Sequence, residues 1–290
     1  MTKAAIAILA VGALGLCLAA HGRRYDVQEK EEIQKTLKLS GPAGIAGLCV
    51  DNVFGRVLVE GYAGPDVILV AHKTIMAESK DRLQKAKDEV KLDVTEKNGS
   101  VDIYVDGPFR CREHDRRHIH MDRDPGYMVQ YDFELKVPFR TKLEVCTVND
   151  GDIEIKNVEG DFEVSNVNGK VGMTDVDGSG DAHTVNGEVA VSFKRAPAGR
   201  CSFKTINGEV VLRFPDEPSA DFRIKTMNGD IYTDFPVTTL PARAAEVSGR
   251  TEGRFVYKSD RFFGVRTGKG GPEIKLETLN GDILIKKRSA

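Results

Sequence analysis

The chain has 290 residues, of which 40% are hydrophobic and 30% charged, and its formal net charge at pH 7 is −2. This length allows one or two domains with a sizeable core, and the composition is that of a soluble globular protein. Without a basic surplus, nucleic acid is not expected as a partner.

Residues 1–20 have the pattern of a signal peptide. A start containing Lys3 is followed by an uncharged run of small apolar residues that ends at Ala20, the expected last residue before cleavage. The run is short for a membrane span, so an uncleaved anchor is the less favoured alternative. Cys17 offers lipidation as a second alternative, but Leu16 is bulky where lipoprotein signals carry a small residue. The sequence therefore predicts a secreted or cell-envelope protein, either periplasmic or at the cell surface. It would touch a membrane only through this segment or a lipid.

The four remaining cysteines are Cys49, Cys111, Cys146 and Cys201. An even number in an oxidising compartment permits disulfides, and the three pairings of four cysteines stay open at this stage. Buried free thiols are the alternative.

Residues 21–107 are predicted to form an N-terminal β part. It would comprise an extended entry segment at 25–45, two strands within 53–72 and a further strand at 101–105. These segments alternate apolar and polar residues or are rich in β-branched residues, as strands with one buried face do.

Residues 74–90 interrupt this β pattern. Ile75, Leu83, Ala86 and Val90 lie near one face of a helix, and charged residues fill much of the rest. One amphipathic helix that packs against the sheet is therefore predicted over 74–90.

Residues 108–126 form a charged insert that we expect to be an exposed loop. It carries His114, His118 and His120, which are residues that zinc sites use. Their spacing matches no metal signature, and several neighbouring arginines would repel a cation. A solvated loop is therefore favoured over a metal site, and no cofactor is predicted.

Residues 127–290 are dominated by a repeat in which an apolar residue, a spacer and glycine precede a short alternating strand, as in Val185-Asn186-Gly187-Glu188-Val189. Glycines recur every nine residues from 151 to 187 and then at steps of 21. Asn-Gly is a turn signal, because both residues tolerate positive φ. The predicted structural turn glycines are Gly151, Gly160, Gly169, Gly187, Gly208, Gly229 and Gly281.

A single short strand cannot bury its apolar face, whereas stacked copies can. The strict period favours an all-β β-solenoid, a parallel β-helix-like stack of short strands, over a sandwich of hairpins. This repeat part would form one continuous domain with 21–107. Residues 236–272 are its least regular segment and are expected to hold longer loops.

The Thr-apolar-Asn-Gly-acidic-apolar units, such as Thr205-Ile206-Asn207-Gly208-Glu209-Val210, resemble those of the bacterial putative-adhesin family. That family consists of exported or membrane-anchored β-repeat domains of largely unknown function. The resemblance implies a right-handed stack of short strands in the envelope and carries over no catalytic residue.

Asp175, Asp177, Ser179 and Asp181 resemble the first half of a calcium loop. The second half fails, because Asn186 stands where a bidentate glutamate is expected. A degenerate repeat is the favoured interpretation.

Acidic residues follow the turn glycines and could stack as a ladder, although solvated turn corners are the favoured interpretation. Lys170 and Ser179 share their register and would relieve the repulsion. The acidic residues are Asp152, Asp161, Glu188, Glu209, Asp230 and Asp282.

No Gly-x-Ser-x-Gly elbow, phosphate-binding loop or paired-histidine metal motif is present. The sequence predicts an exported, adhesin-like scaffold that is not an enzyme and presents a surface to a protein or glycan partner. A structural envelope protein without a specific ligand is the alternative. A polysaccharide-acting β-helix enzyme is the third hypothesis and rests on fold analogy alone.

Overall fold

The computed structural model describes residues 25–39, 47–97, 99–110, 125–241, 246–251, 254–258 and 262–288. The chain divides into two compact units, Met1–Gly160 and Asp161–Ala290, here called unit 1 and unit 2. Strands dominate both units, and the described residues contain one α-helix. The predicted signal peptide at 1–20, with Cys17, lies outside the described residues, so the structure does not test it.

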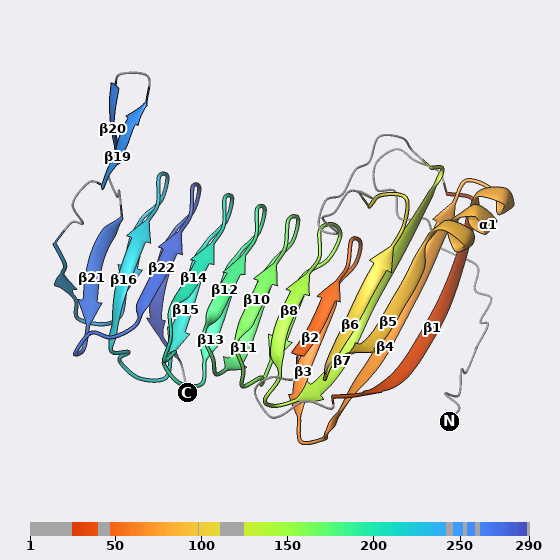
Figure 1. Cartoon of the computed structure of the whole chain (residues 1–290), viewed down its shortest axis with the longest axis horizontal. Coiled ribbons are helices and arrows are strands. Elements are labelled where there is room, and N and C mark those ends of the chain that lie inside the picture. The colour runs from red at the N-terminus through yellow and green to blue at the C-terminus, as the bar shows by residue number, and fades with distance from the viewer. Residues whose placement is uncertain are drawn as a thin grey trace. The chain divides into compact units, whose positions relative to one another are not determined.

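Unit 1 contributes strands to two sheets (Figure 1). In the first, the hydrogen-bonded order is β1 (Val27–Lys38), β4 (Asp66–Ala77), β7 (Tyr127–Pro138), β3 (Val57–Tyr62) and β9 (Ile153–Lys156). In the second it is β5 (Lys91–Lys97), β6 (Ser100–Asp106), β2 (Gly47–Asp51) and β8 (Lys142–Cys146). The long strands β1, β4 and β7 pair antiparallel, whereas β3 and β9 pair parallel.

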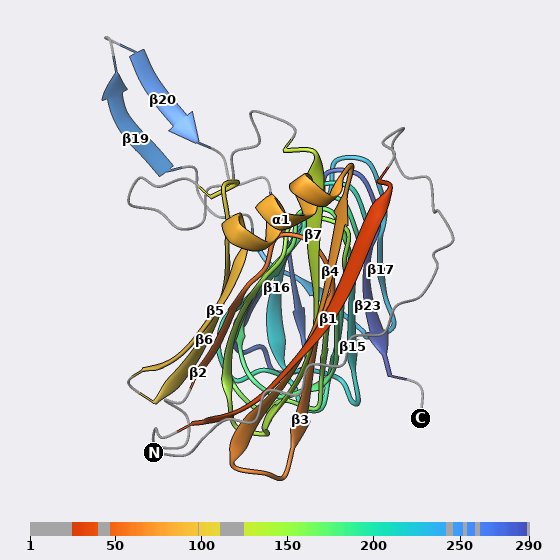
Figure 2. The same cartoon turned by 90° about the vertical axis from the view of Figure 1, so that its right-hand side faces the viewer.

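The helix is shorter than predicted, and α1 spans Lys80–Glu89 instead of 74–90. Residues 74–77 continue β4, where Ile75 is buried and pairs with Val129 of β7. The helix begins after Ser79, whose Oγ accepts a hydrogen bond from the backbone N–H of Arg82 at 3.2 Å. Ile75 fits a helical face and a strand face equally well, which explains the error. Figure 2 shows α1 beside the ends of β4 and β7.

Unit 2 is a stack of parallel strands arranged in two sheets. One sheet runs β11 (Val171–Val176), β13 (Val189–Phe193), β15 (Val210–Phe214), β23 (Ile283–Lys287) and β17 (Ile231–Thr233). The other runs β10 (Phe162–Ser165), β12 (Gly180–His183), β14 (Cys201–Lys204), β22 (Glu273–Glu277) and β16 (Ala220–Lys225), and then β21 (Phe263–Thr267) and β18 (Thr238–Thr239). The pairs β12/β13, β14/β15, β22/β23 and β16/β17 are called coils below.

The coils do not stack in chain order. The coil that comes last in the chain, β22/β23, lies between β14/β15 and β16/β17, and its strands pair parallel on both sides (Figure 1). The segment 236–272 is more regular than predicted. It contains β18, β21 and a hairpin of β19 (Glu246–Thr251) and β20 (Arg254–Lys258). Strands β21 and β18 extend the second sheet antiparallel.

The Thr-apolar-Asn-Gly turn ties each coil to the one before it. Thr205, only 1% exposed, donates its hydroxyl to the carbonyl oxygen of Gly187 at 2.9 Å. The same bond joins Thr184 to Gly169, Thr278 to Gly208 and Thr226 to Gly281. A Cβ atom on Gly208 would lie 2.0 Å from the carbonyl oxygen of Gly187. Glycine is therefore required there because two backbones approach closely.

The asparagines of these turns form a hydrogen-bonded row across unit 2. Each side-chain Nδ2 donates to the Oδ1 of the asparagine in the neighbouring turn at 2.7–2.8 Å. The row runs Asn228, Asn280, Asn207, Asn186, Asn168. Between the two sheets, Phe193, Phe203 and Phe214 are fully buried, with ring centres 5.2 Å apart for Phe193 and Phe214.

Candidate functional site: an acidic cleft in unit 1

The pairing of β5 with β6 places polar side chains on the outer face of the second sheet in unit 1. In β6, Val101, Ile103 and Val105 are buried, so the alternate residues Asp102 and Tyr104 face the other way. In the antiparallel register, Tyr104 pairs with Asp93 and Asp102 with Thr95.

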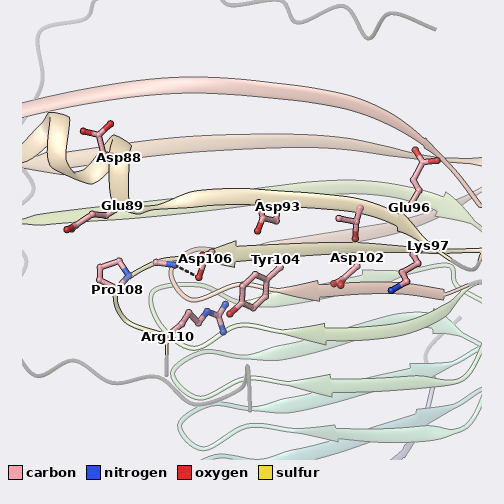
Figure 3. A pocket seen from close by; sticks show the side chains of 12 residues that line it. Asp88, Glu89, Asp93, Glu96, Lys97, Asp102, Tyr104, Asp106, Pro108 and Arg110 are labelled. Carbon is pink, nitrogen blue, oxygen red and sulfur yellow. Dashed lines mark hydrogen bonds between the residues drawn. The ribbon is translucent and has the colours of Figure 1, made fainter. Parts of the chain in front are cut away.

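This face is hollowed into a cleft of about 870 Å³ (Figure 3). Strands β5 and β6 supply most of its wall, and the end of α1 adds Asp88 and Glu89. Six carboxylates but only two cationic side chains line it, so the cleft is strongly acidic. The lining residues are Asp88, Glu89, Asp93, Thr95, Glu96, Lys97, Asp102, Tyr104, Asp106, Gly107, Pro108 and Arg110.

Arg110 is held at one end of the cleft by a buried network. Its Nη1 lies 2.9 Å from Oδ1 of Asp51, and its Nε donates to the carbonyl oxygen of Val105 at 3.0 Å. The guanidinium carbon lies 4.5 Å from the centre of the Tyr104 ring. The side chain is only 4% exposed. The prediction of a solvated loop from residue 108 onwards was therefore wrong for Arg110, whose charge is balanced by a residue far away in sequence.

Cys49 lies beside this cleft, on the strand next to β6, and its register partner is Asp102. It carries a free thiol. Burial, together with the negative charges of Glu144, Asp102 and Asp51, raises the pKa of this thiol to about 12. The thiol therefore stays protonated at neutral pH, and a thiolate is not available there as a nucleophile or metal ligand.

A second hollow of about 650 Å³ lies on the other sheet of unit 1 and is acidic as well. Asp132 and Glu154 come from strands, and Asp150 and Asp152 from the turn around Gly151. Arg56 donates its backbone N–H to Oδ1 of Asp132 at 2.9 Å, and its guanidinium lies 3.0 Å from Glu134. Four carboxylates and one arginine line this hollow.

The residues singled out as metal ligands are not brought together where the structure describes them. Asp177 forms an ion pair with Arg195, and Asp175 one with Arg288. The Oγ of Ser179 accepts the backbone N–H of Gly199 at 2.8 Å, and Asp181 is exposed on β12. Among the described residues, no three His, Cys, Asp or Glu side chains are placed to hold a metal ion. The candidates His114, His118 and His120 lie outside the described residues.

Stacking also relieves the charges that follow the turn glycines. Lys170 lies 2.7 Å from Glu188 in the next coil, and the backbone N–H of Ser179 donates to Asp161 at 3.1 Å. These contacts agree with the register in which Lys170 and Ser179 were expected to offset repulsion. Asp282 accepts the backbone N–H of Asp230 at 2.9 Å.

The acidic cleft is not among the sites predicted from the sequence. Its signal was present in the alternation of Asp102, Tyr104 and Asp106 along β6, with Asp93 of β5 opposite Tyr104. The antiparallel pairing of these strands, which gathers the carboxylates, could not be read from either segment alone.

In the described part of the chain, no helix is long and apolar enough to cross a membrane.

Two solved structures resemble this chain. One is a putative cell adhesion protein from Clostridium sporogenes, with 12% identity, 90% of this chain and 100% of that chain covered, and a TM-score of 0.37. The other is a putative adhesin from Bacteroides fragilis. It has 10% identity and a TM-score of 0.38, and the match covers 89% of this chain and 97% of that chain. No curated protein matches the chain.

A protein-family model gives a direct match. It is described as Toastrack DUF4097 and covers residues 138–261, which include the turn repeats of β10 to β17. This match over residues 138–261 agrees with the family resemblance predicted from the repeats.

Proposed function

We propose that this chain is an exported, non-catalytic scaffold of the cell envelope that binds a basic segment of a partner protein in its acidic cleft. The observation that carries the proposal is the 870 Å³ cleft, in which six carboxylates face two cations. One of those cations, Arg110, already pairs with Asp51. The second acidic hollow of unit 1 supports the same polarity for the partner.

The physical basis is electrostatic. Carboxylates that line a concave surface focus a negative potential and raise the local concentration of cationic groups. Lysine and arginine side chains of an extended segment could reach Asp93, Asp102 and Asp106 at the same time. Each exposed pair contributes little, so binding would depend on several weak contacts and fall with salt.

Export and architecture complete the proposal. The signal-peptide pattern of residues 1–20 supports an envelope location. We infer a right-handed path for the coils, because connections between parallel strands of one sheet are almost always right-handed.

A labelled peptide of alternating lysine and serine tests the cleft. Fluorescence anisotropy at low salt should give saturable binding to the wild-type chain. The triple variant Asp93→Asn, Asp102→Asn, Asp106→Asn should bind on the order of tenfold more weakly, because three pairs of up to about 1 kcal/mol are lost.

The matched control neutralises three exposed carboxylates outside both hollows: Glu60→Gln, Glu209→Gln and Asp216→Asn. It changes the net charge equally and should retain the wild-type affinity. Equal weakening in both triple variants would mean that the peptide senses only net charge, and the cleft would lose its assigned role.

The alternative of a structural envelope protein has one observation in its favour. The asparagine row from Asn228 to Asn168 joins neighbouring coils through side chains as well as backbone. That role predicts no affinity of the cleft for basic segments, so the same titration separates the two functions.

A further inference from the structure

The coil at the end of the stack, β16/β17, presents the same bonding positions that connect the other coils, and none of the residues that the structure describes occupies them. In each covered coil, the glycine of the turn accepts a threonine hydroxyl from the next coil, as Gly281 does from Thr226 at 3.0 Å. The glycine N–H also donates to an asparagine carbonyl, as Gly281 does to Asn228 at 2.9 Å. Gly229 and Asn228 occupy these positions in β16/β17.

The backbone of β17 is open on one side. The N–H of Ile283 donates to Asp230, and the N–H of Asp234 donates to Ile285, so residues 230 and 234 face β23. Because bonding groups alternate along a strand, the N–H and C=O groups of Ile231 and Thr233 face outward. Among the strands that the structure describes, none pairs with this edge.

Among the described residues, burial at β16/β17 differs from burial in the inner coils. Ile283, Val210 and Val189 occupy successive positions of one row and are 0% exposed, but Ile231 in the same row is 38% exposed. At the turn corner, Met227 is 66% exposed, whereas Leu279 in the covered coil is 38% exposed. Ile231 is therefore exposed in a row that is buried in every inner coil, and the corner side chain is more exposed here than in the covered coil.

The unpaired edges of unit 1 differ from this one. Strand β5 carries four charged residues, Lys91, Asp93, Glu96 and Lys97, and β1 also carries charges along its length. Charged side chains protect a sheet edge from pairing with another chain. Strand β17 consists of Ile231, Tyr232 and Thr233 and has no charge between its flanking aspartates.

We propose that the open edge of β17 accepts one further coil from a partner protein: a strand that runs parallel to β17 and is entered through a Thr-apolar-Asn-Gly turn. Its threonine would donate to the carbonyl of Gly229, and its asparagine would extend the side-chain row from Asn228. A lysine after its glycine would face Asp230, as Lys170 faces Glu188 within unit 2.

The flanking charges argue against a second copy of this chain as the occupant. Two β17 strands that paired antiparallel around Tyr232 would place Asp230 of one copy opposite Asp234 of the other. Like charges directly opposite are destabilising. Such a pair would also leave the threonine-to-glycine bonds unmade, because both copies present the same accepting side.

Two labelled peptides test the proposal on the full chain. One has the sequence of residues 274–287, which natively pairs with the other edge of β17, and the second carries Asp282→Lys. Fluorescence anisotropy should show saturable binding of both, with the lysine peptide about 2- to 5-fold tighter at low salt. The variant Thr233→Pro removes one outward N–H and should weaken binding at least tenfold.

A second pair of variants keeps the test independent of folding effects at residue 233. Met227→Lys should weaken peptide binding, and Ile68→Lys, an equally apolar exposed position in unit 1, should not. Absence of binding, or binding that Thr233→Pro leaves unchanged, would overturn the proposal. A wild-type dimer in sedimentation velocity that Thr233→Pro dissociates would also overturn it and assign the edge to a second copy. The cleft variants should bind these peptides normally, which separates this site from the proposed function.

Discussion

The hydroxyl group of Thr205 donates a hydrogen bond to the carbonyl oxygen of Gly187 in the neighbouring coil, at 2.9 Å. Thr205 is 1% exposed, so water cannot replace the bond if it is lost. Thr205→Val keeps the shape of the side chain but leaves the carbonyl without this donor. The expected loss is about 1–3 kcal/mol of unfolding free energy, measured by urea denaturation. Thr205→Ser keeps the hydroxyl and should lose clearly less; equal losses would show that the methyl group, not the bond, matters.

Gly208→Ala should destabilise unit 2 more strongly than an ordinary glycine substitution. The new Cβ would lie 2.0 Å from the carbonyl oxygen of Gly187, so the two coils would have to separate. We expect a loss of more than about 3 kcal/mol in chemical denaturation. Gly172→Ala, within β11 beside Ala190, is the control and should be neutral or slightly stabilising. Similar stability of both variants would contradict the close packing of the turns.

Asp51→Ala should cost about 3–5 kcal/mol, because it leaves the Arg110 guanidinium buried without its carboxylate. The double variant Asp51→Ala, Arg110→Met removes both charges and should recover much of that loss. Thermal and urea unfolding of the single and double variants give the coupling between the two residues. Additive losses would mean that the pair at the end of the cleft is not coupled.

The thiol of Cys49 should react slowly in the folded chain. Its pKa of about 12 lies above the ordinary value of a cysteine thiol, so thiolate forms only as the pH approaches that value. At pH 8 the shift lowers the thiolate fraction on the order of a thousandfold. Iodoacetamide labelling followed by peptide mass analysis should show rapid modification only after denaturation. Fast labelling of folded protein at pH 8 would refute the burial of this thiol among carboxylates.

The export prediction concerns residues that the structure does not describe, and mass spectrometry tests it. Protein isolated from its native envelope should begin at His21, after cleavage behind Ala20. A chain that begins at Cys17 with the added mass of lipid would identify a membrane-tethered lipoprotein instead. Retention of residues 1–20 would indicate an uncleaved anchor.

The strands and turns were the predictable part of this fold. Alternation around Val189 and Val191, with Asn186-Gly187 before them, carries enough local information to place strand β13 and its turn. The start of the helix was not predictable from apolar spacing, because the capping bond of Ser79 and the pairing of Ile75 are what fix it.

The order in which the coils stack was harder to predict from the sequence than the presence of the coils. The turns of the four coils present the same threonine, asparagine and glycine, so the unit at Leu279-Asn280-Gly281 fits against several others equally well. The acidic cleft depends on strand pairing, and the burial of Arg110 depends on Asp51, which is 59 residues away in the chain. Contacts of this kind have no local signature in one sequence.

The position of the β22/β23 coil has a consequence for synthesis. A ribosome makes β16 and β17 before it makes β22 and β23, the strands that both of them pair with. A nascent chain that has not reached residue 272 thus holds two half-stacks with unmatched edges, and β17 has nothing to pair with. Unit 2 must complete its folding late, by insertion of its most C-terminal coil. A premature stop anywhere in β22/β23 would leave exposed strands that proteases can cleave and that can aggregate.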